Sequence, residues 1–132
     1  MSATGSVLLD TTIVVEHLRG KTPSIAQRFK DVTTIYLPLT ALGELLYGAY
    51  NSAFESKSLK EIEDFLKICA ILAPGERTAH HYGRIKADLA QQGNPIPQND
   101  IWIAAVALKH GLPVATRDRH FSFIAGLIIL SW

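Results

Sequence analysis

The chain has 132 residues, 48% of them hydrophobic and 19% charged, which excludes a disordered tail and suits one domain over residues 1–132, with residues 1–5 as a flexible lead-in. Thirteen basic and twelve acidic residues leave a formal net charge of +1, so the overall charge does not indicate a nucleic-acid partner. The apolar runs are too short to span a membrane, and a single cysteine excludes an internal disulfide and suits a reducing cytoplasm.

Short apolar runs alternate along the chain with segments whose apolar residues recur at helical spacing. In chain order, the pattern predicts a strand at residues 7–9, a helix from Thr11 or Thr12 to Gly20, a strand at 34–37, helices at 41–53 and 58–68, a weak strand at 70–72, helices at 76–92 and 101–110, a strand at 112–116, a short helix at 119–125 and a strand at 127–130. Strands that alternate with helices predict a layered α/β domain with a mostly parallel sheet.

Four acidic residues interrupt or directly follow apolar segments, where a structural carboxylate is least expected: Asp10, Glu44, Asp100 and Asp118. Asp10 and Asp118 follow predicted strands, and the carboxyl ends of parallel strands meet at one edge of a sheet. Asp100 and Glu44 lie at or near the first turns of helices that can start at the same edge. If the four side chains converge, protons or a cation must relieve their repulsion, and oxygen ligands suit Mg²⁺ or Mn²⁺.

Each of these acids also has an ordinary structural explanation. Asp10 and Asp118 suit turns that follow strands. Asp100 suits a helix N-cap, and Glu44 suits an exposed helical position. Thr40 is expected to cap the helix that contains Glu44, but a capping box would place its acid one residue earlier, so capping does not account for this glutamate. The hypothesis of a shared acidic site is wrong only if all four ordinary explanations are correct.

An apolar and aromatic set is richer than two short surface helices require: Leu46, Tyr47, Tyr50, Phe54, Leu59, Ile62 and Phe65. We expect part of this set to pack in the core and the remainder to form a groove for an apolar helix of a partner protein. Adjacent residues on a helix point about 100° apart, so His80 and His81 do not predict a transition-metal site. The other histidines, His17, His110 and His120, are also expected to lie on the surface.

Four segments resemble the signatures of PIN domains in their order, spacing and flanking residues: Leu9 to Thr12, Thr40 to Gly48, Asn99 to Ala107 and Thr116 to Phe121. The resemblance covers almost the whole chain and is greatest to the VapC-type toxins of prokaryotic toxin–antitoxin systems. One such segment alone is a weak sign, whereas four in sequence are a strong one. The fourth segment departs from some relatives, which carry an amide at the position of Asp118 and an acid two residues later, where this chain has His120.

The resemblance implies a three-layer α/β/α fold with a mostly parallel central sheet of about five strands. It implies a Mg²⁺- or Mn²⁺-dependent endoribonuclease, usually a homodimer, that a cognate VapB-type antitoxin inhibits and that meets DNA only through that antitoxin. Carried over by position, the four acids form a catalytic, metal-binding quartet: Asp10, Glu44, Asp100 and Asp118. Their neighbours would hydrogen-bond these ligands or the substrate: Thr11, Thr12, Asn99 and Thr116.

Hydrolysis of RNA requires a nucleophilic water, a stabilised pentacovalent phosphate and a neutralised leaving oxygen, which carboxylate-bound divalent ions can supply. We expect Asp10 and Asp100 to hold the principal metal ion. Glu44 and Asp118 would then position the water or a second ion. Such hydrolysis leaves 5′-phosphate and 3′-hydroxyl ends, whereas 2′,3′-cyclic phosphate ends would indicate a metal-independent route driven by the 2′-hydroxyl.

Arg117 adjoins Asp118 and is the first candidate for a contact with an RNA phosphate, ahead of Arg84 and Lys86. Two other functions fit the same residues. One is a PIN-type nuclease in RNA maturation, or a structure-specific DNA nuclease, although larger relatives of that kind usually carry added domains. The other is a catalytically silent binding module that acts mainly in a DNA-binding regulatory complex, which the retention of all four acids disfavours.

Overall fold

The computed structural model describes residues 5–132, so the expected lead-in lies outside the described residues except for Gly5. The strands are β1 (Val7–Leu9), β2 (Ile35–Pro38), β3 (Ala70–Leu72), β4 (Val114–Thr116) and β5 (Ile129–Ser131). The helices are α1 (Thr11–Arg19), α2 (Pro23–Phe29), α3 (Leu39–Tyr50), α4 (Glu55–Leu66), α5 (Glu76–Gln92) and α6 (Gln98–His110), with a 3₁₀ helix, η1 (Arg119–Phe123), before the last strand. Within residues 5–132, no helix is long and apolar enough to cross a membrane.

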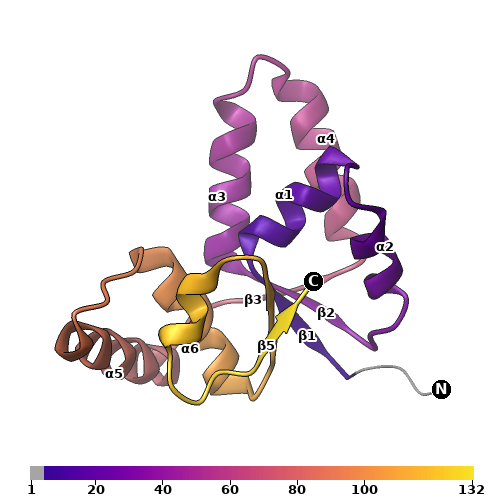
Figure 1. The fold of residues 1–132 in the computed structure, drawn as a ribbon. Helices are drawn as coiled ribbons and strands as arrows, with labels where there is room; N and C mark the ends of the chain where they lie inside the picture. Colours follow the sequence, from indigo (N-terminus) through magenta and orange to yellow (C-terminus); the bar gives the residue numbers. More distant parts are fainter. Residues whose placement is uncertain (1–4) are drawn as a thin grey trace.

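The strands form one parallel sheet in the spatial order β3-β2-β1-β4-β5, with β1 at its centre (Figure 1). Leu9 lies opposite Ala115 in the β1–β4 pair, so the residues that follow them, Asp10 and Thr116, lie side by side at the carboxyl edge. Ligand sites in open α/β sheets gather at this edge. The predicted parallel sheet of about five strands is confirmed.

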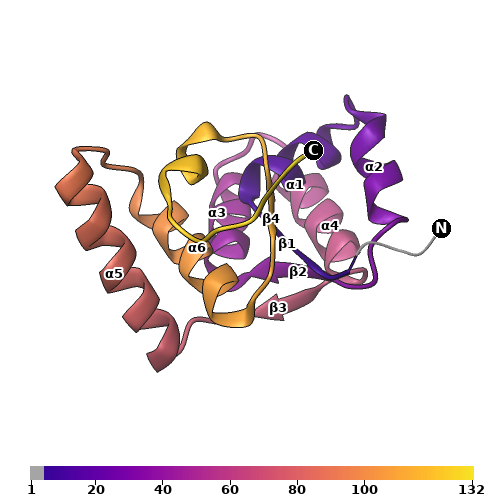
Figure 2. The ribbon, with the colours of Figure 1, turned by 60° about the horizontal axis from the view of Figure 1, so that its bottom comes forward.

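Helices cover both faces of this sheet (Figure 2). Helices α5 and α6 lie on one side, where α5 packs along α6, and helices α1 and α2 lie on the other. Each crossover between parallel strands passes through helical segments, as parallel pairing requires. The result is the three-layer α/β/α arrangement that the resemblance implies.

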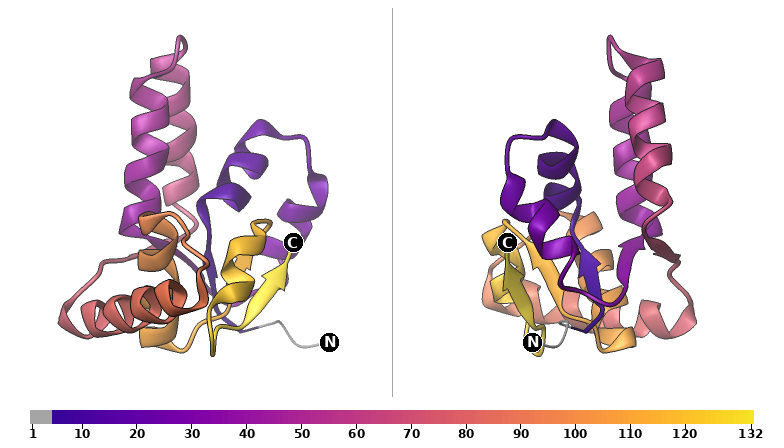
Figure 3. Two further views of the ribbon diagram at one scale, coloured as in Figure 1. Left: turned by 60° about the vertical axis from the view of Figure 1, so that its left-hand side comes forward. Right: turned by 90° about the vertical axis from the view of Figure 1, so that its right-hand side faces the viewer.

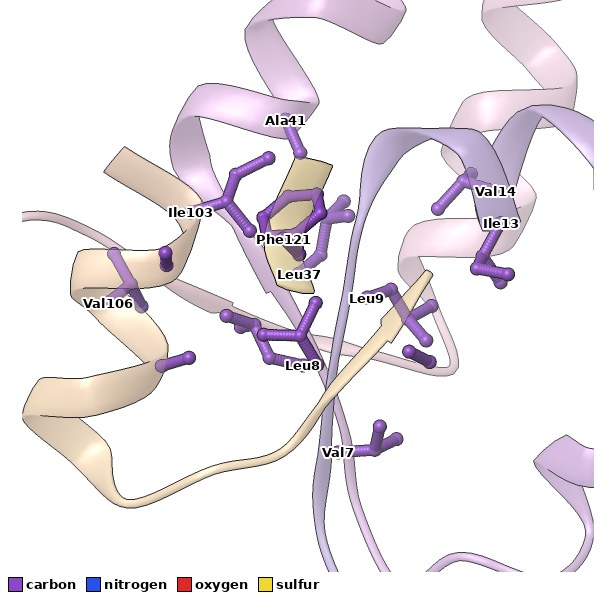
Figure 4. Close-up of a cluster of buried hydrophobic side chains, with 14 of the residues drawn as sticks. Val7, Leu8, Leu9, Ile13, Val14, Leu37, Ala41, Ile103, Val106 and Phe121 are labelled. Atoms are coloured by element: carbon purple, nitrogen blue, oxygen red, sulfur yellow. The ribbon is translucent and has the colours of Figure 1, made fainter. Parts of the chain in front are cut away.

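The interior of the sheet and the inner faces of the helices form a continuous apolar core (Figure 4). Leu8 and Leu9 are fully buried neighbours in β1 that point to opposite faces of the sheet, as the two-residue period of a strand requires. Leu8 lies on the side of Ile103 in α6, whereas Leu9 lies on the side of Ile13 in α1. Phe121 of η1 is also fully buried, and it holds the turn after β4 against this core.

Helices α3 and α4 form an antiparallel pair that extends away from the sheet (Figures 1 and 3). Part of the apolar set of this region is buried, including Ile62 and Phe65. Three aromatic side chains near the far end of the pair are instead open to solvent: Tyr47 and Phe54 are 72% exposed, and Tyr50 is 63% exposed. The expected division of this set between the core and the surface is confirmed.

Two elements of the first half differ from the sequence-based prediction. Helix α2 was not predicted, because its seven residues offer a single pair of large apolar residues at helical spacing, Ile25 and Phe29, of which only Ile25 is fully buried. Helix α3 begins at Leu39, directly after Pro38, whose extended backbone (φ −64°, ψ 140°) provides the break before the helix. Thr40 consequently lies inside the first turn, and its prediction as an N-cap is wrong.

His17 is half-buried, so its prediction as a surface histidine is also wrong. Its ring packs against Phe29 and Phe65, with centroid separations of 4.8 and 5.7 Å. Burial lowers the pKa of His17, because the charged imidazolium loses solvation there. His17 of α1, Phe29 of α2 and Phe65 of α4 therefore form an aromatic cluster between these three helices.

Candidate active site

Asp10 directly follows β1 at the N-cap position of α1 and is only 2% exposed. Its side chain makes no capping hydrogen bond. Instead, its Oδ2 accepts hydrogen bonds from the Oγ1 hydroxyls of Thr12 (2.7 Å) and Thr116 (2.8 Å). Burial raises the pKa of Asp10, and the two hydroxyls oppose that rise by stabilising the carboxylate. A turn or cap therefore does not explain this side chain.

Glu44 reaches the same edge from α3. Its Oε1 accepts a hydrogen bond from Thr11 Oγ1 at 2.7 Å and another from Asn99 Nδ2. Thr11 is the first residue of α1, and Asn99 lies in the first turn of α6, so one carboxylate connects the starts of two helices. An ordinary exposed helical position does not predict these contacts.

Asp118 follows β4 and caps η1, where its Oδ1 accepts a hydrogen bond from the backbone N–H of His120 at 2.9 Å. The turn explanation is therefore correct for this residue. The same turn also connects it to Asp10, because its backbone N–H donates to Thr116 Oγ1 at 2.9 Å and that hydroxyl donates to Asp10. Its structural role and its place beside the other acids are compatible.

Asp100 is partly buried in the first turn of α6. Its pKa is raised to about 6, first by burial and then by the negative charges of Asp10, Asp118 and Glu44. Each of these three acids is therefore near enough to oppose its ionisation. The structure thus brings together four acids that are distant in sequence, which we call the acidic site: Asp10, Glu44, Asp100 and Asp118.

Among residues 5–132, no lysine or arginine forms a salt bridge with the acidic site. Within the same residues, the basic side chain that contacts an acid of the site is a histidine: His120 Nδ1 lies 2.9 Å from Asp118 Oδ1. Arg117 adjoins the site, but its Nη2 donates to the carbonyl oxygen of Trp132 at 2.6 Å. Carboxylates that converge without cationic side chains offer the oxygen donors that a hard divalent cation prefers.

The raised pKa values predict how the stability of the metal-free chain depends on pH. The pKa of Asp100 rises from 3.8 to about 6 on folding, so the folded state binds more protons than the unfolded state between these values. Asp100 should therefore contribute a fall in the free energy of unfolding as pH rises from about 4 to about 6, and no further change above that range. Urea denaturation in EDTA across this range measures the slope. Asp100→Asn should reduce it, and an unchanged slope in that variant would contradict the assignment.

A cavity of about 750 Å³ adjoins the acidic site at η1. Its lining residues are Thr12, Arg117, Asp118, Arg119, His120, Ser122 and Phe123. A second cavity of about 560 Å³ shares both arginines and extends to Trp132. Phe123 is 42% exposed. Positive side chains beside an accessible aromatic ring are features that bind single-stranded nucleic acid.

The predicted neighbours of the acids lie at the site. Thr11 and Asn99 hydrogen-bond Glu44, and two further threonines hydrogen-bond Asp10. The weaker phosphate candidates lie elsewhere: Arg84 and Lys86 belong to α5 and line neither of these two cavities.

Sequence reasoning missed two residues beside the acids and left open whether a third, His120, affects the position of Asp118. Arg119 and Phe123 line the larger cavity, and His120 contacts Asp118. In the sequence, nothing about Arg119 and Phe123 indicates a place at the site, since both belong only to a predicted short helix. His120 does carry such an indication, because it occupies the position, two residues after Asp118, at which some relatives carry an acid. Its prediction as a surface histidine is correct for exposure, since the side chain is 51% exposed, but omits its place at the site.

The parallel sheet with acids at its carboxyl edge matches a known family. Residues 7–127 match the model of the PIN domain. The chain therefore belongs to the PIN-domain family.

Comparison with individual proteins places the chain more narrowly. It is 35% identical over 127 residues to ribonuclease VapC2 of Haemophilus influenzae, which covers 95% of this chain and 96% of that protein. It is 33% identical, with the same coverage, to the tRNA(fMet)-specific endonuclease VapC of Shigella flexneri. A chain in the crystal structure of DNA-bound VapBC from Salmonella typhimurium superposes with a TM-score of 0.90 at 31% identity, covering 100% of this chain and 99% of that one. Within the PIN-domain family, the chain belongs to the VapC ribonucleases.

Proposed function

We propose that this chain is the toxin of a type II toxin–antitoxin pair and acts, as a single domain, as a divalent-metal-dependent endoribonuclease that hydrolyses RNA phosphodiester bonds. The observation that carries the proposal is the convergence of four carboxylates that, within residues 5–132, form no salt bridge with lysine or arginine. The relatives named as ribonucleases, one of them as a tRNA(fMet)-specific endonuclease, support RNA as the substrate.

A divalent cation, Mg²⁺ or Mn²⁺, fits the acidic site. The donors are carboxylate oxygens, which both ions accept. Burial and then the neighbouring negative charges raise the pKa of Asp100, and a bound cation stabilises a carboxylate against both. When bound, such an ion polarises a phosphoryl oxygen and lowers the pKa of a nearby water. The protein then has to hold the ion, orient the water and keep the scissile phosphate in place.

The surroundings of each acid suit it to a different role, either binding the cation or orienting the water. Asp10 and Asp100 hold the cation, and two threonine hydroxyls fix the orientation of the Asp10 carboxylate. Glu44 and Asp118 orient the attacking water or hold a second ion. The hydroxyl and amide donors on Glu44 hold its long side chain at the edge of the site, where an exposed glutamate would otherwise sample many rotamers.

The cavity at η1 is the proposed path of the RNA strand. It adjoins Asp118 and carries Arg117 and Arg119, whose guanidinium groups suit phosphate oxygens. The exposed ring of Phe123 offers a surface on which a base can stack. The strand would thus pass the acidic site with a phosphate near Asp118.

A groove of about 420 Å³ lies between α1, α3 and α4 and is the proposed docking site of a VapB-type antitoxin. Its apolar lining includes Val15, Leu18 and Ile62, which suits an apolar helix of a partner. Thr11 and Glu44 line the same groove, so a bound helix would cover one side of the acidic site. Inhibition would then follow from direct blockage of the site.

The groove takes only part of the apolar and aromatic set that predicts a docking site, since Ile62 lines it. The exposed side chains of Tyr47, Tyr50 and Phe54 are not among its lining residues, whereas Gly48 and Ala49 are. The DNA-bound VapBC structure of Salmonella typhimurium supports an antitoxin partner and contact with DNA through it. A homodimer and a cytoplasmic location complete the proposal.

Expression of the chain alone should arrest growth, and Asp10→Asn should relieve the arrest. The asparagine keeps the shape of the side chain but removes a charge that the cation needs. The purified chain with Mg²⁺ should leave 5′-phosphate and 3′-hydroxyl ends, which end-specific ligation and sequencing detect, and EDTA should stop cleavage.

Asp88→Asn is the matched control, because Asp88 is an exposed acid of α5 outside the acidic site. It should arrest growth like the unchanged chain. Equal arrest by Asp10→Asn would reject the catalytic role of the acidic site and favour a silent binding module. Products with 2′,3′-cyclic phosphate ends would reject the hydrolytic mechanism.

A further inference from the structure

His120 is close enough to two of the acids to share a cation with them. One ligand atom from each of Asp100, Asp118 and His120 lies within 4.8 Å of the other two. The histidine is tied to this place, since its backbone N–H and its ring Nδ1 both lie 2.9 Å from Asp118 Oδ1. The imidazole is 51% exposed, so it has room to turn.

The geometry of a cation shell fits this group. Ligands bound at about 2.1 Å in an octahedral shell lie about 3 Å apart when adjacent and about 4.2 Å apart when opposite. The three ligand atoms therefore need to approach one another by less than about 2 Å to share one ion. A change of rotamer at an exposed histidine is sufficient for a movement of that size.

We propose that His120 supplies an imidazole nitrogen to a second cation of the acidic site, which it shares with Asp100 and Asp118. The inference rests on the proposed metal-dependent function and names a ligand beyond the four acids. Imidazole nitrogen binds transition metals such as Mn²⁺ and Zn²⁺ in preference to Mg²⁺, which favours oxygen donors. The site therefore prefers Mn²⁺ to Mg²⁺, and the preference depends on this histidine.

A ligand role and a purely positioning role predict different results for two substitutions. In His120→Gln the side-chain amide can still donate a hydrogen bond to Asp118, but the imidazole nitrogen is gone. In His120→Ala both are gone. If the residue only orients Asp118, glutamine preserves metal binding and alanine does not. If it is a ligand, both variants lose Mn²⁺ affinity.

The test measures Mn²⁺ and Mg²⁺ binding to the metal-free full chain by calorimetry at one neutral pH. His120→Gln and His120→Ala should each weaken Mn²⁺ binding at least about tenfold, since even the loss of an outer-shell partner costs about that much. Mg²⁺ binding should change by less than about threefold, because oxygen donors dominate its affinity. Pulsed electron paramagnetic resonance of bound Mn²⁺ should detect a coordinated ¹⁴N nucleus in the unchanged chain and not in His120→Gln.

The control is His80→Gln, at an exposed histidine of α5, which should leave both affinities and the ¹⁴N signal unchanged. Equal Mn²⁺ affinity in the unchanged chain and His120→Gln, or a missing ¹⁴N signal, would overturn the ligand role while leaving a metal-binding site in place. An unchanged chain that binds neither ion would instead overturn the proposed metal-dependent function. The two failures are therefore distinguishable.

Discussion

Replacing Asp100 with asparagine is expected to abolish RNA cleavage and, at the same time, to stabilise the metal-free chain. The two side chains have nearly the same shape, so the change removes charge without creating a cavity. It deletes a proposed cation ligand, and cleavage should slow by about a thousandfold or more, equivalent to about 4 kcal/mol in the activation free energy. It also removes one of four charges whose repulsion opposes folding. The melting temperature in EDTA should therefore rise by about 2–5 °C.

Single-turnover cleavage of RNA and scanning calorimetry in EDTA measure these two effects on the same protein. Asp88→Asn again serves as the control, and it should change neither quantity appreciably. Adding Mn²⁺ should stabilise the unchanged chain more than the Asp100→Asn variant. The variant lacks a proposed ligand and binds the ion more weakly, and an ion stabilises a protein by binding its folded state. A variant that cleaves RNA at the normal rate would remove Asp100 from the catalytic group. A lower melting temperature in EDTA would show that the converged charges do not oppose folding.

Replacing Gly48 with glutamate is expected to weaken antitoxin binding by at least about a hundredfold while RNA cleavage continues. Gly48 lies in α3 and lines the proposed docking groove. Apart from the adjoining residues and the backbone of α3 itself, no heavy atom lies within 4 Å of the Cβ that a substitution would add, so the fold accepts the side chain. The new carboxylate would stand where an apolar helix is expected to pack, and its desolvation opposes binding.

Titration of labelled antitoxin with the purified chain measures this effect, and RNA cleavage by the same preparations tests the acidic site. The matched control is Gly83→Glu, the same change at a helical glycine of α5 whose added Cβ likewise meets nothing within 4 Å beyond its adjoining residues and its own helix backbone. A double variant, Tyr50→Glu with Phe54→Glu, tests the exposed aromatic end of the α3–α4 pair. Normal antitoxin binding by Gly48→Glu, with binding lost in the double variant, would move the docking site from the groove to that end.

Much of the fold is predictable from the sequence because its signals are local. Helix α5 has the bounds that its apolar period and flanking glycines predict, Glu76 to Gln92. Helix α6 ends where expected, because Gly111 adopts a left-handed backbone conformation (φ 65°) that other residues adopt at a cost. The local signal is insufficient where tertiary packing supplies the stability, as in the seven-residue helix α2, which buries only Ile25.

The same distinction applies to the acidic site. The sequence by itself identified Asp10, Glu44, Asp100 and Asp118, because their flanking residues repeat the four PIN signatures in order, and strand ends predict which edge they share. Only the tertiary structure decided that burial and neighbouring charges raise the pKa of Asp100 to about 6, that an exposed histidine joins the acids, and which side of α3 forms a groove. Those properties depend on distances between side chains far apart in the chain, and a one-dimensional pattern contains no such distances.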